Sequence, residues 1–127
     1  MTGIWKLGLC SIVVGTLALT GSIAQAQGAS KGADVYKKKG CAACHNISKA
    51  GVENPGYGGK AGPDLAGVTD RRSRDWLQRW LKDPPAMLQS DSTAMAIMAE
   101  SKGLKMPNLK LSDSEIEALI DYLAVKQ

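Results

Sequence analysis

Five consecutive residues constrain this chain more than any other feature: Cys41-Ala42-Ala43-Cys44-His45. C-x-x-C-H is the attachment signature of c-type haem. Two thiols at this spacing add to the two vinyl groups of the porphyrin, and the histidine that follows supplies a nitrogen ligand to the iron. His45 is the only histidine of the chain, so no other imidazole can bind the metal. The motif predicts one haem c, covalently held through Cys41 and Cys44, with His45 as an axial ligand.

Three other interpretations of the motif stay open at the level of the sequence. A thioredoxin-like redox pair requires strands that alternate with helices, and no segment of the chain has that pattern. A zinc site needs a fourth ligand, for which only Cys10, in an apolar stretch, is left. A disulfide between Cys41 and Cys44 would leave His45 without a role. Haem attachment accounts for more of the motif than any of these.

Residues 1–26 have the pattern of a secretory signal peptide. A short positive start is followed by the apolar stretch Leu7 to Leu19, and an A-x-A cleavage pattern ends at Ala26. We expect cleavage after Ala26, a periplasmic location, and one small domain over residues 27–127. The alternative is an uncleaved membrane anchor, because residues 7–23 approach the length of a spanning helix.

Every periodic segment of the remaining chain indicates a helix, and no segment alternates like a strand. Ser30, Ser73 and Ser112 are expected to cap three helices, because a serine side chain accepts a hydrogen bond from the free N–H groups of a first turn. Ser112 and Glu115 form the S-x-x-E pattern of a capping box. A first helix is expected from Ser30 to the motif, a second over 74–83, ended by Pro84-Pro85, and a third over 92–101, closed by Gly103. A last helix is expected after Ser112, where one face carries four apolar residues: Ile116, Leu119, Ile120 and Leu123. Residues 46–62 are expected to form a loop.

These elements predict an all-α fold, a small helical domain wrapped around one covalent haem. Aromatic residues make up only 5% of the chain, and a domain of about a hundred residues buries little surface by itself. We therefore expect the haem to complete the core, and the polypeptide to be poorly structured without it.

Four motifs follow one another in a fixed order between residues 30 and 125. They are Gly32-x-x-x-Tyr36, the C-x-x-C-H motif, Gly62-Pro63-Asp64-Leu65, and Met106-Pro107 ahead of a capped terminal helix that ends in Tyr122-Leu123. In this order the motifs resemble those of class I c-type cytochromes. The resemblance implies a monohaem, His/Met-ligated domain of cytochrome c-like fold.

The resemblance also implies roles for single residues. The carbonyl of Pro63 would accept the proton on the far nitrogen of His45, and Leu65 would pack on the haem. Trp76, together with Trp80, is expected in the core or at the haem wall, where an indole N–H reaches a propionate. Three arginines are further candidates to bind a propionate: Arg71, Arg72 and Arg74. At least two of the three are expected to have their guanidinium in water instead.

Met106 is the expected distal ligand, in a loop that Pro107 stiffens ahead of the terminal helix. Its thioether would favour ferrous iron and raise the reduction potential relative to a bis-histidine site. Met95 and Met98 stand at i, i+3 on a helix, a spacing expected of core packing. Met87 follows the two prolines in a loop, and its spacing does not exclude it as a ligand.

The function that the resemblance implies is one-electron transfer in the periplasm, in a respiratory or a sulfur- or nitrogen-oxidation chain, with no enzymatic activity and no small-molecule substrate. Two alternatives remain. One is a haem enzyme or sensor for peroxide or a small gas, in which Met106 is displaced. The other is a haem subunit of a larger oxidoreductase complex.

Charge gives a weaker indication of partners. The chain has 16 Lys and Arg against 12 Asp and Glu, a net charge of +4 that gives no reason to expect nucleic acid. Contact with a membrane is expected only if residues 1–26 are retained. The lysines near the expected haem loops form either a basic rim that attracts the acidic patch of a redox partner, or an ordinary solvated surface. These are Lys37, Lys38, Lys39, Lys49, Lys60, Lys102, Lys105 and Lys110.

Overall fold

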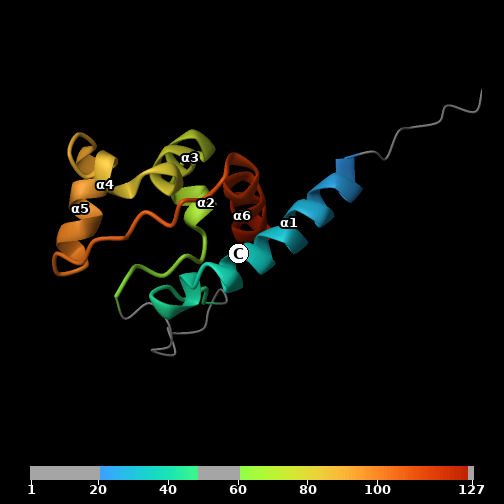
Figure 1. Ribbon diagram of the computed structural model, residues 1–127, viewed down its shortest axis with the longest axis horizontal. Helices are drawn as coiled ribbons and strands as arrows, with labels where there is room; N and C mark the ends of the chain where they lie inside the picture. Colours follow the sequence, from blue (N-terminus) through green and yellow to red (C-terminus); the bar gives the residue numbers. More distant parts are fainter. Residues whose placement is uncertain (1–20, 49–60, 126–127) are drawn as a thin grey trace, which may run out of the picture.

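The computed structural model describes residues 21–48 and 61–125 of the chain. Over these two ranges the regular structure is entirely helical, so the predicted all-α fold is confirmed. No helix in this part of the chain is both long and apolar enough to cross a bilayer. The elements are α1 (Gly21–Lys38), the 3-10 turn η1 (Cys41–Ala43), α2 (Val68–Arg71), α3 (Arg74–Lys82), α4 (Pro84–Met87), α5 (Ser92–Glu100) and α6 (Asp113–Val125) (Figure 1).

The helices α1 and α6 pack side by side and form the frame of the molecule (Figure 1). Their backbones meet at Gly32, where a Cβ atom would lie 1.9 Å from the carbonyl oxygen of Ala118 and 2.5 Å from Cβ of Tyr122. One helical turn further on, the rings of Tyr36 and Tyr122 pack with their centroids 5.6 Å apart. The Gly32-x-x-x-Tyr36 spacing therefore places the glycine, which has no side chain, and the aromatic ring of Tyr36 on the same face of α1.

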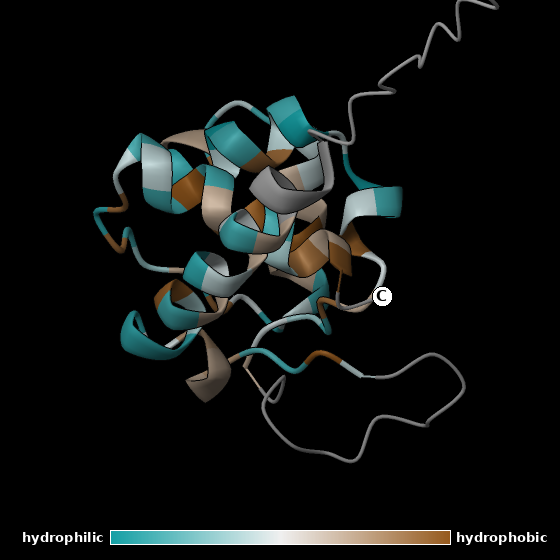
Figure 2. Ribbon diagram, turned by 90° about the vertical axis from the view of Figure 1, so that its right-hand side faces the viewer, coloured by the Kyte–Doolittle hydropathy of each residue, from teal (hydrophilic) through white to brown (hydrophobic). Residues whose placement is uncertain are grey.

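The apolar core is built around α6. Figure 2 shows hydrophobic segments toward the middle of the bundle and hydrophilic ones on its outside. The face predicted for the terminal helix is the buried one, since its four apolar residues are between 1% and 4% exposed. They are Ile116, Leu119, Ile120 and Leu123, and they are joined by Val35, Val68, Leu77, Leu81 and Leu111.

Two of the three predicted serine caps are present. At the start of α3, Oγ of Ser73 accepts a hydrogen bond from the N–H of Trp76 at 3.2 Å. At the start of α6, the N–H of Ser112 donates to Oε2 of Glu115 at 2.8 Å, and the N–H of Glu115 donates to Oγ of Ser112 at 3.3 Å. The capping box read from the sequence is therefore confirmed.

The first helix begins earlier than predicted. The helix α1 starts at Gly21 and continues through Ser30, so the prediction that Ser30 caps it is wrong. The residues between them are rich in alanine and glutamine, which favour helix, and no proline interrupts them. The helix therefore includes Ala26. Cleavage of the chain after Ala26 remains a prediction. Its first turns project beyond α6 (Figure 1).

Pro84-Pro85 ends one helix and begins another. The helix α3 ends at Lys82 rather than at Asp83. Asp83 instead caps the short helix α4, since its Oδ1 accepts the N–H of Ala86 at 3.2 Å. A proline in the first turn has no N–H to leave unsatisfied, so the residues that stop α3 are suited to start α4.

The helix α5 begins at Ser92 as predicted and ends at Glu100, one residue before the predicted end. Oδ1 of Asp91 caps its first turn by accepting the N–H of Ala94 at 2.9 Å. Gly103, at φ 79°, closes its last turn, and the N–H of this glycine donates to the carbonyl of Met98 at 2.9 Å. Of the predicted loop over 46–62, the parts that the structure describes are non-helical, and the remainder lies outside the described residues.

Candidate functional site

The Cys-x-x-Cys-His motif follows directly after α1. Gly40 makes the turn between α1 and η1 with φ 74°, a left-handed conformation that glycine adopts without strain. The 3-10 turn then carries Cys41, and the N–H of His45 donates to the carbonyl of Cys41 at 2.9 Å. Cys41 and Cys44 form no disulfide with each other; Cys41 is buried and Cys44 is exposed. Burial raises the pKa of the Cys41 thiol.

The imidazole of His45 is held in one tautomer. Its Nδ1–H donates to the carbonyl oxygen of Pro63 at 2.8 Å, the contact that the resemblance implied. A neutral ring with its proton on Nδ1 has its lone pair on Nε2, which is then the atom that can bind a metal. Gly62 leaves room for the ring, because a Cβ atom there would lie 2.4 Å from Cε1 of His45.

Tyr36 joins this site to the frame of the molecule. Its hydroxyl donates to the backbone carbonyl of His45 at 2.9 Å. Burial, with a smaller contribution from the neighbouring Cys41, raises the pKa of Tyr36 to about 12. The phenol therefore stays protonated, and remains a donor, over the whole neutral range.

A cavity of about 340 Å³ lies beside the motif. Its volume falls within the range of cofactor pockets, about 300 to 1,000 Å³. Apolar side chains from several elements form much of its wall, among them Val68, Leu77 and Leu119. All seven residues proposed from the sequence border it: Cys41, Cys44, His45, Pro63, Leu65, Trp76 and Met106.

The structure separates the four methionines that competed as ligands. Met106 borders the cavity and packs against the core. Met87 is buried but does not border the cavity; it borders a second, shallow hollow between α3, α4 and α6. The expectation that Met95 and Met98 are both core residues is wrong. Met95 is 41% exposed, and Met98 borders the cavity, because α5 presents one side to the cavity and the other to solvent.

Of the two tryptophans, one of which was expected to reach a propionate with its indole N–H, Trp76 has that N–H engaged within the protein. Its Nε1–H donates to both carboxylate oxygens of Asp91, each at 3.2 Å. The ring still borders the cavity and stacks on Trp80 with a centroid distance of 5.5 Å. Trp76 thus forms part of the cavity wall, while its polar atom faces the cap of α5.

Arg72 carries a buried polar atom without a partner. Its Nε has no hydrogen bond to any described residue. The guanidinium lies over the ring of Trp76, 5.6 Å from its centroid, and Arg72 borders the cavity. A carboxylate in the cavity would provide the missing acceptor, and haem has two propionates. The described residues therefore fit this cofactor: two thiols, an oriented imidazole, a thioether and a guanidinium with one unsatisfied nitrogen.

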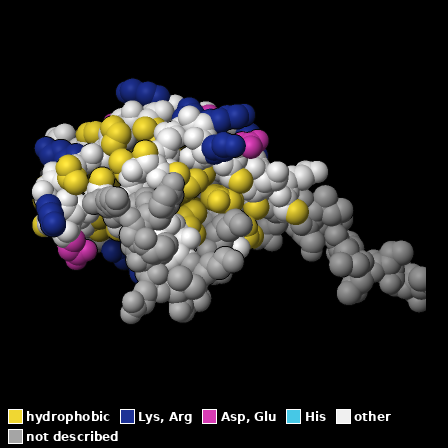
Figure 3. Space-filling model, turned by 90° about the horizontal axis from the view of Figure 1, so that it is seen from below, with side chains coloured by type: hydrophobic (Ala, Val, Ile, Leu, Met, Phe, Trp, Pro, Cys, Tyr) yellow, Lys and Arg dark blue, Asp and Glu magenta, His cyan; other side chains and the backbone are white. Residues whose placement is uncertain are grey.

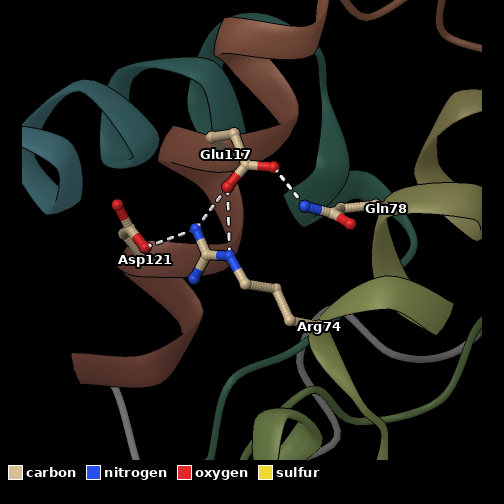
Figure 4. Close-up of polar contacts among 4 residues, drawn as sticks. All are labelled: Arg74, Gln78, Glu117 and Asp121. Atoms are coloured by element: carbon tan, nitrogen blue, oxygen red, sulfur yellow. Dashed lines mark hydrogen bonds and ion pairs between the residues drawn. The ribbon is translucent and has the colours of Figure 1, made fainter.

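The other two arginines of this turn are exposed, as expected for at least two of the three, and both also form hydrogen bonds with the protein. Arg71 donates from NH2 to the carbonyl of Asp64 at 2.9 Å and from NH1 to the carbonyl of Ala66. Arg74 donates to Glu117 and Asp121 of α6 (Figure 4). Arg72 alone of the three has an unsatisfied buried atom.

Asp64 accepts several hydrogen bonds at the edge of the cavity. Its carboxylate takes the N–H of Ala66 at 2.7 Å and contacts both Ser48 and Asn46. Burial alone would raise the pKa of Asp64, but the hydrogen bonds from Ser48 and Ala66 outweigh it and hold the pKa below its usual value. The side chain is therefore a carboxylate at neutral pH.

The zinc and thioredoxin interpretations of the motif receive no support from residues 21–48 and 61–125. No group of three or more His, Cys, Asp or Glu in these ranges is arranged to hold a metal ion by itself. The strands that a thioredoxin-like fold requires are also missing from the same ranges.

Comparison with known proteins agrees with this geometry. Residues 29–125 match the family model described as Cytochrome c. The chain belongs to the cytochrome c family. The family gives this cytochrome its broad function, haem-based electron transfer, and implies a covalently bound haem c. Among curated proteins, none matches the chain.

Solved structures show the same fold. A cytochrome c from Rhodothermus marinus superposes with a TM-score of 0.67 at 25% identity, over 80% of this chain and 78% of that chain. Two structures of an engineered form of that protein, one of them bound to a carbene intermediate, superpose with TM-scores of 0.66 and 0.63 at 24% identity over the same shares. The small helical cytochrome c fold is therefore established for this chain.

Several contacts at the site were missed in the sequence. Asp91 directly precedes a helix, so its role as a cap could have been read locally, but its bond to Trp76 could not. The contacts of Asp64 and the place of Met98 depend on how distant segments pack, for which the sequence has no local signal.

Proposed function

We propose that this cytochrome is a periplasmic carrier of single electrons, with one haem c attached through Cys41 and Cys44 and with His45 and Met106 as axial ligands. Bound haem would supply the ferric–ferrous couple. The observation that carries the proposal is that both thiols, the imidazole and the thioether border one and the same cavity. Nδ1 of His45 is already engaged with Pro63, which leaves Nε2 for the iron.

The chain's own residues explain why a carrier fits better than a catalyst. Two axial ligands leave no coordination position for a substrate, and the chain has no second histidine for acid–base work near the iron. The apolar wall keeps water from the cofactor, and Arg72 offers a cation to a propionate. The enzyme or sensor alternative requires Met106 to leave the iron.

The decisive experiment uses the full chain, exported with its own leader in a host that attaches haem c. Haem staining after denaturing electrophoresis and the intact mass should show one covalent haem per chain. The ferrous protein should be reversibly oxidised by one electron and should not bind carbon monoxide. A mass equal to that of the bare polypeptide would refute haem attachment, and ready binding of carbon monoxide would favour the enzyme or sensor.

Export and cleavage after Ala26 belong to the same proposal. N-terminal sequencing of periplasmic protein should find Gln27 first. Recovery from membranes only, with Trp5 still present, would show that the leader is an anchor.

We also propose an acidic redox partner that docks at a basic rim. Lys37, Lys38, Lys102 and Lys105 are exposed, and Lys105 borders the cavity. Seen from below (Figure 3), apolar side chains extend from the α5 end of the molecule toward its middle, with Lys and Arg side chains around their edge. Lys39 contributes less free charge, because it pairs with Glu115 at 3.2 Å. Lys49 and Lys60 lie outside the described residues.

A further inference from the structure

The carboxylate of Asp64 joins the two chain segments between which the His45–Pro63 hydrogen bond is made. Oδ1 accepts the N–H of Ala66 at 2.7 Å and the N–H of Ser48 at 3.3 Å. Oδ2 accepts the hydroxyl of Ser48 at 2.5 Å and the amide Nδ2–H of Asn46 at 3.4 Å. One side chain therefore takes four donors, three of them from residues just after His45 and one from the residue after Leu65.

Backbone hydrogen bonds continue the same connection on both sides. The N–H of Gly62 donates to the carbonyl of Cys44 at 3.0 Å, and the N–H of Leu65 donates to the carbonyl of Asn46 at 2.8 Å. Between these two bonds, Nδ1–H of His45 donates to Pro63 at 2.8 Å. Beyond Asn46, the carboxylate of Asp64 continues the connection between the two segments by binding Ser48 on one and Ala66 on the other.

We propose that Asp64 is a positioning residue: it fixes the length of the His45–Pro63 hydrogen bond and through it sets the reduction potential of the bound iron. The proposal rests on the electron-transfer function proposed above. A carbonyl that holds the far N–H of a ligating imidazole makes that imidazole a better electron donor. Better donation favours ferric iron, so a looser His45–Pro63 bond raises the reduction potential.

The chemistry of the side chain explains why an aspartate suits this position. An ionised carboxylate only accepts hydrogen bonds and has about four lone-pair sites, which matches the four donors. An asparagine side chain has only one acceptor oxygen. Its NH₂ group is itself a donor and cannot accept a hydrogen bond from the N–H or O–H groups that it would face. Asp64→Asn therefore removes half of the acceptors with almost no change in volume. It also removes one negative charge at the cavity, which raises the potential by itself, so the Nδ1–H exchange of His45 is the readout specific to positioning.

A purely structural role is the competing explanation, and two matched controls separate it. Arg71→Lys loosens the same loop but keeps the positive charge at the cavity, because a lysine cannot reproduce both contacts of Arg71 with the backbone carbonyls of Asp64 and Ala66. Ser112→Ala removes the side-chain oxygen of the capping box of α6, far from the His45–Pro63 hydrogen bond. Both should lower stability, and neither should move the potential as Asp64→Asn does.

The experiment compares wild type, Asp64→Asn and the two controls as exported holoproteins. It measures the reduction potential by spectroelectrochemistry, the exchange of the Nδ1–H of His45 by NMR of the ferrous form, and stability by urea unfolding. For Asp64→Asn we expect covalent haem as in wild type, faster Nδ1–H exchange and a potential shifted upward. If Asp64→Asn yields no holoprotein, Ser48→Ala, which removes one donor from the same carboxylate, should show the same shifts in smaller size.

Two results would overturn the proposal. One is a variant that loses stability while its potential and Nδ1–H exchange stay those of wild type. The other is a shift of potential that occurs without faster Nδ1–H exchange, as loss of the Asp64 charge alone would give, or that occurs equally in Ser112→Ala. A wild-type protein without covalent haem would instead refute the proposed function itself, and the positioning role with it.

Discussion

At the scale of the residue, the site is defined by which polar atoms already have partners inside the protein. Nδ1 of His45 is bound to Pro63 and the indole N–H of Trp76 to Asp91, so neither is available to the cofactor. Nε of Arg72 is buried without a partner, and the thioether of Met106 borders the same cavity. The atoms left over are the ones that an iron and a carboxylate would use.

Met106→Ala should leave the haem covalently attached but open one coordination position. We expect a lower reduction potential, loss of the sulfur-to-iron band at the red end of the ferric spectrum, and ready binding of carbon monoxide by the ferrous form. Absorbance spectra with and without carbon monoxide check this. Met87→Ala and Met98→Leu are the controls, and both should keep the band. Loss of the band in Met98→Leu but not in Met106→Ala would transfer the ligand to α5.

Arg72→Gln should lower the reduction potential. A guanidinium beside the bound cofactor disfavours the more positive ferric state, and a partly exposed charge is worth about 1 kcal/mol, or about 40 mV for one electron. Spectroelectrochemistry measures the shift. Arg74→Gln is the matched control, because Arg74 is bound to α6 instead. Equal potentials in the Arg72 variant and the wild type would mean that Arg72 does not face a propionate.

Tyr36→Phe should change how stability depends on alkaline pH. The pKa of Tyr36 is raised to about 12 in the folded protein, against about 10 in an unfolded chain. The folded state therefore holds the proton more tightly, and the resulting stabilisation is complete below about pH 10 and is lost as the pH rises toward 12. The difference in unfolding free energy between wild type and Tyr36→Phe should be constant up to about pH 10 and then shrink. A constant difference up to pH 12 would contradict this, and urea unfolding of both holoproteins measures it.

At the scale of the element, α6 connects the parts that build the site. It packs against α1 through Gly32, and it is tied to α3 by a network of charged side chains (Figure 4). In that network Arg74 of α3 donates to Glu117 at 2.5 Å and to Asp121 at 2.8 Å, and Gln78 donates to Glu117 as well. Because α1 leads into the haem motif and α3 supplies the cavity wall, α6 sets their distance from each other.

Gly32→Ala should be strongly destabilising. Its Cβ would lie 1.9 Å from the backbone carbonyl of Ala118, so α1 and α6 must separate. Overpacking of this kind costs about 3 kcal/mol. Gly28→Ala on the same helix is the control, because its Cβ meets only the movable side-chain end of Asp121, at 2.6 Å. Urea unfolding compares the two, and similar losses in both variants would show that the close approach at Gly32 is not the cause.

At the scale of the whole molecule, the positions of the charged side chains matter more for partner binding than the net charge. The net charge of +4 is modest, but exposed lysines lie at the edge of the cavity and in the segment that leads into the motif. Other lysines are neutralised by partners, such as Lys82, which pairs with Asp113 at 2.6 Å. A partner with an acidic patch would be drawn to the first group.

Lys105→Gln should slow electron transfer to an acidic partner and flatten its dependence on salt. Ions screen exposed charges over about 8 Å at physiological ionic strength, so the wild-type rate should fall as salt rises. Stopped-flow measurement of the second-order rate against ionic strength checks this. Lys82→Gln removes the same charge from a residue that does not border the cavity, and it should change the rate little. Equal effects of both variants, or a flat wild-type profile, would show that the lysines are ordinary solvated surface.

The sequence by itself determined the features that depend on near neighbours. The haem motif is five residues long, and the caps at Ser73 and Ser112 reach three residues along the chain. The apolar face of α6 repeats every three or four positions. Such patterns are set by local sterics and hydrogen bonding, so they could be read before any packing was known.

Tertiary structure alone decided which of several equivalent residues reach the cavity. Three arginines within four positions had the same chemistry, and packing placed Arg71 and Arg72 at the cavity but bound Arg74 to α6. Of the two at the cavity, Arg71 is held by backbone carbonyls of a loop, while Nε of Arg72 has no partner among the described residues. Trp76 meets Asp91 across 15 residues, and Asp64 meets Ser48 across 16. Contacts at these separations exist only once the helices have packed, because no local rule specifies which distant group a side chain will find. The sequence therefore determined the cofactor and the helices, and packing determined how the protein holds and tunes that cofactor.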